Sequence, residues 1–265
     1  MRLYVEVARR AFQQQLAYRA AAIAGVITNA GFGCFKALIF IALYRSQNGQ
    51  SVGGYDLRDA LTFVWFTQGM ITVIAIWGWY DIAQTITTGA VATDLSRPYD
   101  YFTFWYARDL GRAACLMLVR WVPSFLIGVV LFQVWFPTNP AQLALFTVSL
   151  VLAVTVSFAL RFLVNLGAFW WLDFRGIAGL WNLLVTLLSG FELPLVYFPN
   201  GLRAVCDVLP FRGMIQTPAD IFLGKATGGD ALALIARQAM WAVVLVVGAQ
   251  LMMHVATRKV VVQGG

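Results

Sequence analysis

Charged residues are scarce in this chain: Asp, Glu, Lys and Arg together make up 12% of its 265 residues, whereas soluble domains average about 25%. Apolar residues make up 60% of the chain. A chain of this length has too little interior to hide so much apolar surface from water. The composition therefore excludes an ordinary soluble domain and indicates a protein embedded in lipid. Its net charge of +7 has a membrane explanation before a nucleic-acid one.

Cysteine and histidine are also rare, with three Cys and one His. The cysteines, Cys34, Cys115 and Cys206, are far apart and odd in number, which argues against a disulfide framework and against a CxxC metal site. The sequence has no HExxH and no phosphate-binding P-loop pattern. We therefore expect no catalytic centre, no metal and no ATP site in this chain.

Long apolar runs are what the chain has instead. A membrane-spanning helix needs about 20 apolar residues, and runs of this kind recur six times. They predict an all-α membrane protein in which residues 1–265 form a single domain. The expected spans are Ala20–Tyr44, Ala60–Tyr80, Leu116–Phe136, Gln142–Leu163, Ile177–Phe191 and Ala231–His254.

The distribution of cations predicts the orientation of these spans. An even number of spans places both termini on one side, and cytoplasmic segments carry the excess of Lys and Arg. With the N-terminus inside, 11 cations fall in inner segments and five in outer segments. We therefore expect both termini to be cytoplasmic in a plasma (inner) membrane. The richness in Ala, Val and Arg is typical of a bacterial source.

Two segments near the N-terminus favour packing at the membrane. Residues 1–19 alternate apolar and polar side chains at helical spacing, which predicts an amphipathic helix lying in the membrane surface. Both an ordinary anchor and a coupling role remain open for it. In the first span, small or polar residues recur every fourth position and predict a helix-packing face, whose partner lies in this chain or in another. This face comprises Ala21, Gly25, Asn29 and Gly33.

A polar segment, residues 81–100, separates the second and third spans on the expected cytoplasmic side. It contains a partial apolar stripe of helical spacing, and Pro98 ends the helix at or before Arg97. The aromatic residues that follow are expected in the membrane interface, with Arg108 and Arg112 reaching headgroups. The stripe comprises Ile82, Ile86, Val91 and Leu95.

The longest outer segment, residues 193–229, is apolar yet broken by four prolines. Short, broken, apolar segments at membrane depth are tolerated where protein buries them or where they line a cavity. We therefore expect a re-entrant helical hairpin. Glu192, at its start, is expected either to pair with Lys36 or Arg237 or to face a water-filled vestibule. For the cations within spans, snorkelling to the interface is favoured over function; these are Lys36, Arg120, Arg161 and Arg237.

Four stretches, taken in order, resemble the ABC-2 type permeases, the membrane subunits of ATP-binding-cassette exporters that have a separate ATPase. The two outer stretches and their spacing are the more specific. Ser96 departs from the apolar residue that is common at its position. The stretches are Leu16–Arg19 (LAYR), Ile86–Pro98 (ITTGAVATDLSRP), Gly190–Pro199 (GFELPLVYFP) and Leu209–Gly224 (LPFRGMIQTPADIFLG).

The resemblance implies an interfacial helix, six spans, a cytoplasmic coupling helix and a re-entrant outer hairpin. It also implies a non-catalytic subunit: two copies of a nucleotide-binding subunit would carry ATP and Mg²⁺, and an identical or related second permease chain would complete the transporter. The expected cargo is an amphiphile, either a drug or a lipid. Membrane lipids are further expected partners, and nucleic acid is not.

The resemblance also assigns roles to residues. It implies ATPase coupling by Thr85, Ile86, Gly89, Val91, Asp94, Leu95, Arg97 and Pro98. It implies an outer gate formed by Glu192, Pro194, Phe198, Pro199, Pro210, Phe211 and Pro218. A membrane-embedded lipid-modifying enzyme and a non-transporting structural subunit are the alternatives, and the enzyme would need clustered polar residues or metal-binding carboxylates near one face.

Overall fold

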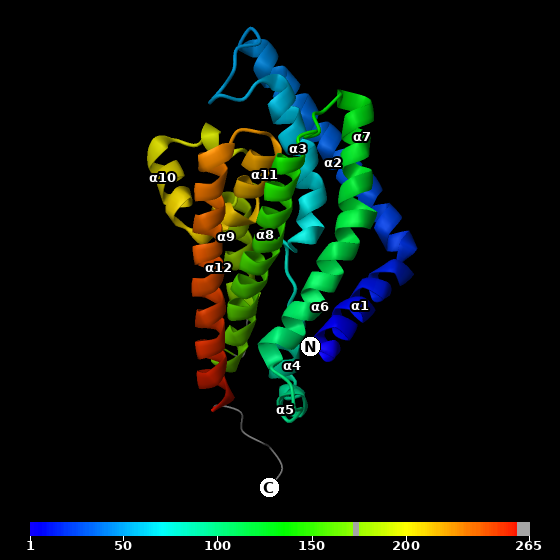
Figure 1. Cartoon of the computed structure of the whole chain (residues 1–265), viewed down its shortest axis with the longest axis vertical. Coiled ribbons are helices and arrows are strands. Elements are labelled where there is room, and N and C mark those ends of the chain that lie inside the picture. The colour runs from blue at the N-terminus through cyan, green and yellow to red at the C-terminus, as the bar shows by residue number, and fades with distance from the viewer. Residues whose placement is uncertain (172–174, 259–265) are drawn as a thin grey trace.

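The computed structural model describes residues 1–171 and 175–258 as a bundle of helices that run roughly along one axis (Figure 1). Four helical stretches in this part of the chain are long and apolar enough to cross a membrane, which confirms an all-α membrane protein. They are Arg19–Ser46, Tyr101–Phe132, Pro140–Phe169 and Gly228–Thr257.

Three of the expected spans agree closely with observed helices. Helices α2 (Arg19–Ser46), α8 (Pro140–Leu166) and α12 (Gly228–Thr257) match the expected first, fourth and sixth spans to within three residues at each end. Each of these helices is predominantly apolar and contains few charged residues, so hydropathy alone places it.

The expected second span is wrong in its last part. Helix α3 (Leu57–Val73) ends seven residues before Tyr80. The backbone then leaves the helical conformation, with φ of +48° at Ala75 and +78° at Gly78. Hydropathy does not report this break, because the residues on both sides of it are apolar.

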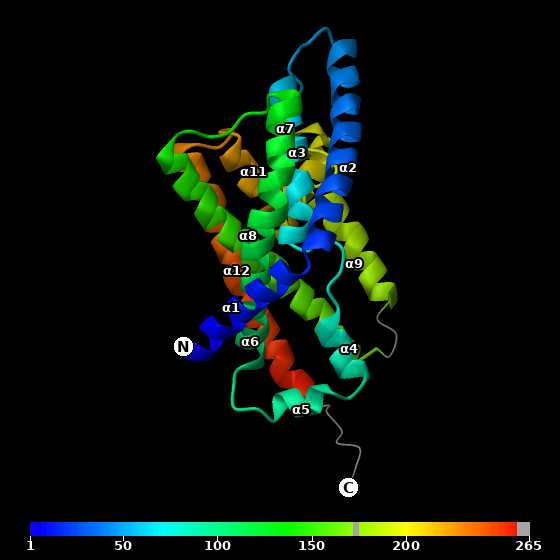
Figure 2. The same ribbon diagram turned by 90° about the vertical axis from the view of Figure 1, so that its right-hand side faces the viewer.

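Two short helices, α4 (Asp81–Thr87) and α5 (Val91–Leu95), follow this break at one end of the bundle (Figure 2). The chain turns between them at Gly89, whose φ is +78°. Helix α5 ends before Arg97, as Pro98 predicts. The last turn of α12 lies toward the same end, whereas α7, α10 and α11 lie toward the other.

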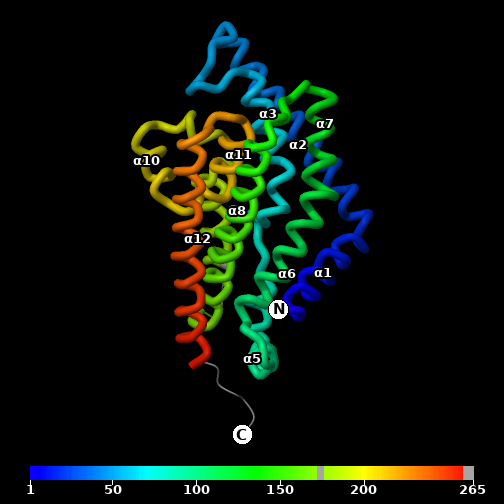
Figure 3. The backbone as a smooth tube through the Cα atoms, in the orientation of Figure 1, coloured from blue at the N-terminus to red at the C-terminus, as the bar shows by residue number. Residues whose placement is uncertain are grey.

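The expected third span, Leu116–Phe136, begins 15 residues too late. Helix α6 (Tyr101–Leu116) continues through a π-helical turn (Met117–Trp121) into α7 (Val122–Phe132), and Figure 3 shows the three as one continuous path. The widened turn lies directly before Pro123, whose missing N–H cannot bond the carbonyl four residues earlier.

Three of the aromatic residues of α6 that were expected in the membrane interface are buried inside the bundle. Tyr101, Phe102 and Trp105 are each 5% exposed. The Phe102 ring packs against the rings of Phe158 and Phe162 on α8, at centroid distances of 5.3 and 5.0 Å. An aromatic-rich segment reads as a membrane belt by composition, but here the rings join two helices.

The remaining helix of the bundle, α9 (Arg175–Leu188), ends three residues before the expected fifth span does. Gly190, with φ of +83°, then turns the chain into the outer segment. Asp173, which interrupts the start of this span in the sequence, lies outside the described residues.

The outer segment is broken into short helices, and each of its four prolines lies at or near the start of one. Proline is tolerated there because the first N–H groups of a helix have no intrahelical partner. The elements are a 3-10 turn (Leu195–Tyr197), α10 (Asn200–Val208), a second 3-10 turn (Pro210–Met214) and α11 (Gln216–Phe222).

The small-residue face of α2 contacts helices of this same chain. The Asn29 amide donates to the Gln68 carbonyl of α3 at 3.0 Å. A Cβ on Gly33 would lie 3.0 Å from the Trp65 ring of α3. At the other end of the face, the Arg120 guanidinium donates to the Ala21 carbonyl and lies against Gly25. Close backbone approach of this kind is how helices associate in lipid.

Helix α1 (Arg2–Ala17) crosses α6 at Gly111. A Cβ there would lie 2.0 Å from the backbone carbonyl oxygen of Ala8, so only glycine permits this approach. The amphipathic helix expected from the sequence is therefore present. Part of its apolar face packs on α6, while Leu3 and Leu16 remain exposed.

This crossing yields a first prediction. Gly111→Ala is expected to displace α1 and to destabilise the protein by about 1–3 kcal/mol, because a backbone carbonyl cannot rotate out of the way. Gly31→Ala is the matched control, since a Cβ there meets no atom within 4 Å. Apparent melting temperatures in nonionic detergent, followed by tryptophan fluorescence, measure both. Equal melting temperatures would contradict the close crossing.

Candidate functional site

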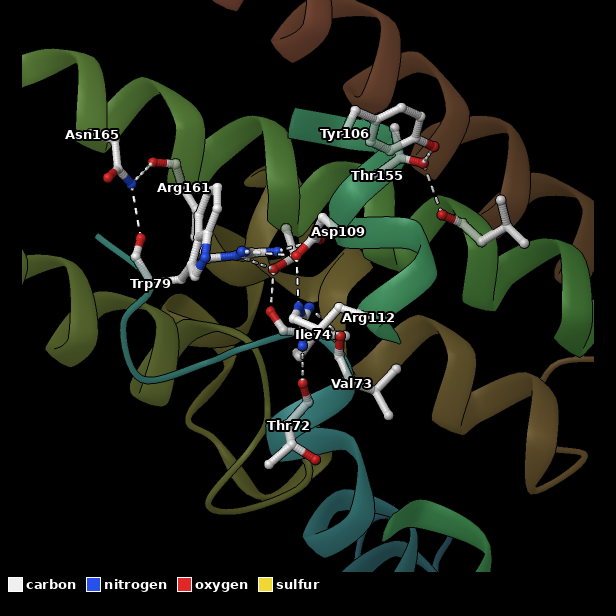
Figure 4. Close-up of polar contacts among 12 residues, drawn as sticks. Thr72, Val73, Ile74, Trp79, Tyr106, Asp109, Arg112, Thr155, Arg161 and Asn165 are labelled. Carbon is white, nitrogen blue, oxygen red and sulfur yellow. Dashed lines mark hydrogen bonds and ion pairs between the residues drawn. The ribbon is translucent and has the colours of Figure 1, made fainter. Parts of the chain in front are cut away.

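A cluster of charges lies buried between α6 and α8 (Figure 4). Asp109 on α6 is 2% exposed and Arg161 on α8 is 1% exposed. Arg161 Nη2 donates to Asp109 Oδ2 at 2.8 Å, and Arg112 Nε donates to Asp109 Oδ1 at 2.8 Å. One carboxylate therefore neutralises part of the charge of two guanidiniums away from water, where an unpaired charge is very costly.

The same cluster binds the end of α3. A helix end leaves carbonyls without partners, and side chains satisfy three of them here. Arg112 donates to the carbonyls of Thr72 and Val73 at 2.5 and 2.9 Å, and Ser157 on α8 donates to the carbonyl of Ile74 at 2.5 Å. The break after Val73 is therefore held open by side chains of α6 and α8. The expectation that Arg112 reaches headgroups is wrong.

Asn165, one turn beyond Arg161 on α8, joins this cluster to α4. Its Nδ2 donates to the Trp79 carbonyl at 2.9 Å, and its Oδ1 accepts from the Ala83 backbone N–H at 2.9 Å. The Arg161 guanidinium also lies 5.6 Å from the centroid of the Trp79 ring. Helix α4 is therefore hydrogen-bonded to α8, which is in turn joined to α6 through Asp109.

The α4–α5 segment has one buried side and one exposed side. Ile82 and Val91 are 0% and 3% exposed and pack with the aromatic residues of α6 and α8, and Ile86 and Leu95 are partly buried in the same cluster. Thr85 and Asp94 are half-buried. Gly89 is exposed, with no heavy atom within 4 Å of an added Cβ. Arg97 and Pro98 are exposed as well.

The α4–α5 segment therefore has one side fixed to the bundle and one side exposed. Its apolar stripe fixes it to the bundle, while its turn at Gly89 projects freely from the end. The sequence predicted the stripe correctly. Of the residues assigned to ATPase coupling, Ile86, Val91 and Leu95 pack on the bundle, whereas Gly89, Arg97 and Pro98 are exposed.

At the other end of the molecule, Glu192 pairs with Lys36 rather than with Arg237. Lys36 Nζ lies 2.7 Å from Glu192 Oε2, whereas Arg237 donates to the Asp207 carbonyl at 2.7 Å. The snorkelling interpretation is wrong for Arg161, which is buried. Arg120 donates a hydrogen bond to the Ala21 carbonyl of the neighbouring helix α2.

A second polar cluster fixes the outer segment. Asp220 of α11 accepts hydrogen bonds from the Tyr55 hydroxyl at 2.9 Å, from Gln216 at 2.7 Å and from Arg212 at 2.9 Å. Burial, and then the charge of Asp220, raises the pKa of Tyr55, so its hydroxyl stays protonated and donates. Since Tyr55 lies in the loop directly before α3, this cluster ties the segment of residues 193–229 to the start of α3.

The residues assigned to the outer gate are spread over this segment. Pro194, Pro210 and Pro218 are buried, Phe198 and Phe211 are partly buried, and Glu192 and Pro199 are exposed. The Phe211 ring packs on Trp181 of α9 at 5.9 Å between centroids.

Sequence reasoning missed Asp109 and Asp220. Both carried a usable signal. Asp109 precedes Arg112 by three residues, which places both on one helix face if the helix begins at Tyr101. Asp220 lies in the outer stretch LPFRGMIQTPADIFLG, eight residues after Arg212.

Comparison with known proteins then decides the family. Residues 33–264 match the family described as ABC-2 family transporter protein. This chain belongs to the ABC-2 transporter family. Members of this family are membrane transport permeases that are generally non-catalytic and typically pair with an ATPase subunit. A search of curated proteins found no match to the chain.

The buried cluster yields a second prediction for this ABC-2 permease. Asp109→Asn leaves Arg161 and Arg112 without a carboxylate and is expected to cost about 3–5 kcal/mol. Arg161→Gln is expected to cost less, because Asp109 keeps Arg112 as a partner. Apparent melting temperatures in detergent rank the variants.

Arg108→Gln serves as the control. Its pair with Asp81, at 3.6 Å, and its contact with the Trp105 ring, at 4.7 Å, are partly exposed, and such contacts contribute about 1 kcal/mol or less. A larger loss for Arg161→Gln than for Asp109→Asn would contradict the shared carboxylate.

Proposed function

We propose that this chain is the membrane subunit of an exporter that moves an amphiphile, a drug or a lipid, out of the cytoplasm or the inner leaflet, driven by ATP hydrolysis on a separate subunit. The observation that carries the proposal is the α4–α5 segment. It is exposed at its turn, fixed by its apolar side and hydrogen-bonded to α8 through Asn165. A partner that moves this segment moves the helices with it.

The proposed assembly contains two copies of this kind of permease, as a homodimer or with a related chain, and two copies of the nucleotide-binding subunit. ATP and Mg²⁺ bind to that subunit. Helices α3 and α9 complete six crossings beside the four longer helices, α1 lies in the membrane surface, and the outer segment is re-entrant. Both termini are cytoplasmic in a bacterial plasma membrane. The excess of cations in the inner segments supports this orientation.

In the proposed cycle, ATP closes the two nucleotide-binding subunits and displaces the α4–α5 segments. Asn165 carries the displacement into α8, and the pairs of Asp109 with Arg161 and Arg112 carry it into α6. Packed helices then shift as bodies, since close-packed interfaces slide or rotate instead of deforming continuously. The outer segment, including the residues from Glu192 to Pro218, opens on release. The shift is limited by the difference in ATP affinity between the two states.

The family membership also weighs on the alternatives. A lipid-modifying enzyme needs a cluster of acidic or metal-binding side chains, and no group of three such residues lies together in the described residues. A non-transporting structural subunit would have no use for an exposed turn coupled to a buried charge cluster.

The third prediction tests the coupling segment. Asp94→Arg reverses a charge on the exposed segment, and Gly89→Pro cannot keep the φ of +78°. Each is expected to lower ATPase activity of the purified complex to the level of the ATPase alone, with normal membrane insertion. Co-purified ATPase, ATP hydrolysis and the amount of inserted protein are the readouts.

Asp230→Arg is the matched control. It makes the same charge change at an exposed position in the first turn of α12, at the opposite end of the molecule. It is expected to leave association and stimulation unchanged. An intact, fully stimulated complex from Asp94→Arg or Gly89→Pro would refute the coupling role.

A further inference from the structure

A lateral groove of about 390 Å³ lies between α2, α3 and the residues that follow α9. Its wall is mostly apolar and aromatic, with a few polar side chains. This volume falls in the range of small-molecule sites. The lining residues are Thr28, Asn29, Phe32, Phe35, Lys36, Gln68, Ile71, Trp77, Phe191 and Glu192.

Lys36 is the cation of this groove. Its side chain is 17% exposed, and its ammonium lies 2.7 Å from Glu192 Oε2 and 4.4 Å from the centroid of the Phe191 ring. An ammonium has three N–H donors. Among the described residues, Glu192 is the acid that pairs with it. The nitrogen is enclosed by protein and makes no well-aligned hydrogen bond among the described residues, so its ion pair with Glu192 leaves N–H donors unused.

Gln68 adds a second donor. The side chain lies in the wall of the groove and the residue is 1% exposed, yet its Nε2 has no hydrogen-bond partner among the described residues. A buried amide without a partner is unfavourable, because its desolvation is not compensated by a hydrogen bond. Gln68 thus has no acceptor and Lys36 has one carboxylate for three N–H donors, which favours a ligand that brings oxygen acceptors rather than donors.

Glu192 differs from Lys36 in its freedom to leave. Its side chain is 48% exposed, so the carboxylate can turn into water at small cost. Lys36, in the middle of α2, has no such route. Glu192 directly precedes the outer segment. Its ion pair with Lys36 therefore also fixes the start of that segment.

We propose that this groove binds an anionic amphiphile. Its acidic head takes the place of Glu192 on the Lys36 ammonium and within reach of Gln68, and its apolar chain lies along Phe32, Phe35 and Trp77. The exchange keeps Lys36 neutralised, because one carboxylate or phosphate replaces another. Displacement of Glu192 frees the start of the outer segment.

That this ligand is cargo, and that its binding opens the outer side, rests on the exporter function proposed above. A cationic amphiphile fits the groove less well. Its head would meet the Lys36 ammonium directly beside Glu192, and it would offer no acceptor to Gln68. The polarity of the unpaired groups therefore decides between the two charge classes.

Tryptophan quenching tests the proposal, because Trp77 lies in the groove and is 54% exposed. The full-length chain in lipid nanodiscs is titrated with 11-bromoundecanoate and with its cationic counterpart, 11-bromoundecyl-trimethylammonium. The Trp77→Phe variant gives the quenching from other tryptophans, which is subtracted. The anion is expected to give saturable quenching, and the cation is not.

Two substitutions shift the affinity in opposite directions. Lys36→Met is expected to weaken binding of the anion about tenfold or more, since it removes a charge-assisted hydrogen bond. Glu192→Gln is expected to tighten it severalfold, because the competing carboxylate is gone. Arg120→Met is the control. It removes a cation that contacts α2 outside this groove, and it is expected to leave the affinity for the anion unchanged.

Tighter binding in Glu192→Gln separates ligand exchange from a merely structural ion pair, which would weaken or leave binding unchanged. Saturable binding of the cation that Glu192→Gln weakens, or no saturable binding of the anion, would overturn the proposal. The assay needs no ATPase. Its failure therefore leaves the exporter function standing, and failure of ATPase coupling leaves the binding result intact.

Discussion

The carboxylate of Asp109 is the group on which the packing of α3, α6 and α8 against one another depends. It is buried with Arg161 and shared with Arg112, and Arg112 in turn holds the carbonyls that the end of α3 leaves free. Three helices therefore meet at one charge. In lipid, where apolar packing gives little preference for one arrangement of helices, such a centre specifies which helices meet and at what height.

Three of the ion-pair centres among the described residues, those of Asp109, Asp220 and Glu192, differ in how firmly they hold. Asp109 and Asp220 each accept several hydrogen bonds out of contact with solvent, and losing one partner there is costly. The pair of Lys36 and Glu192 is open on one side. In the proposed cycle, the firm centres would keep their helices together, and the open pair is where the proposed ligand would bind.

Hydropathy placed α2, α8 and α12 well because their ends coincide with changes in polarity. It failed at Val73, where an apolar chain stops being helical for reasons that lie in Arg112 and Ser157, far away in sequence. It failed at Tyr101 because buried aromatic contacts and interfacial belts have the same composition. The stripe from Ile82 to Leu95 was predictable from local spacing, whereas its attachment through Asn165 needed the tertiary structure.

The central claim is that an ATP-binding partner grips the α4–α5 turn. A photo-crosslinking amino acid at Thr88, beside Gly89, tests it most directly, with the same group at Gln50 in the opposite loop as the reference. Both positions are exposed. In the native complex, the account predicts that Thr88 crosslinks to a subunit that is labelled by an azido-ATP analogue and that Gln50 does not. Crosslinking of that subunit from Gln50, or none from Thr88 in a complex that hydrolyses ATP, would contradict it.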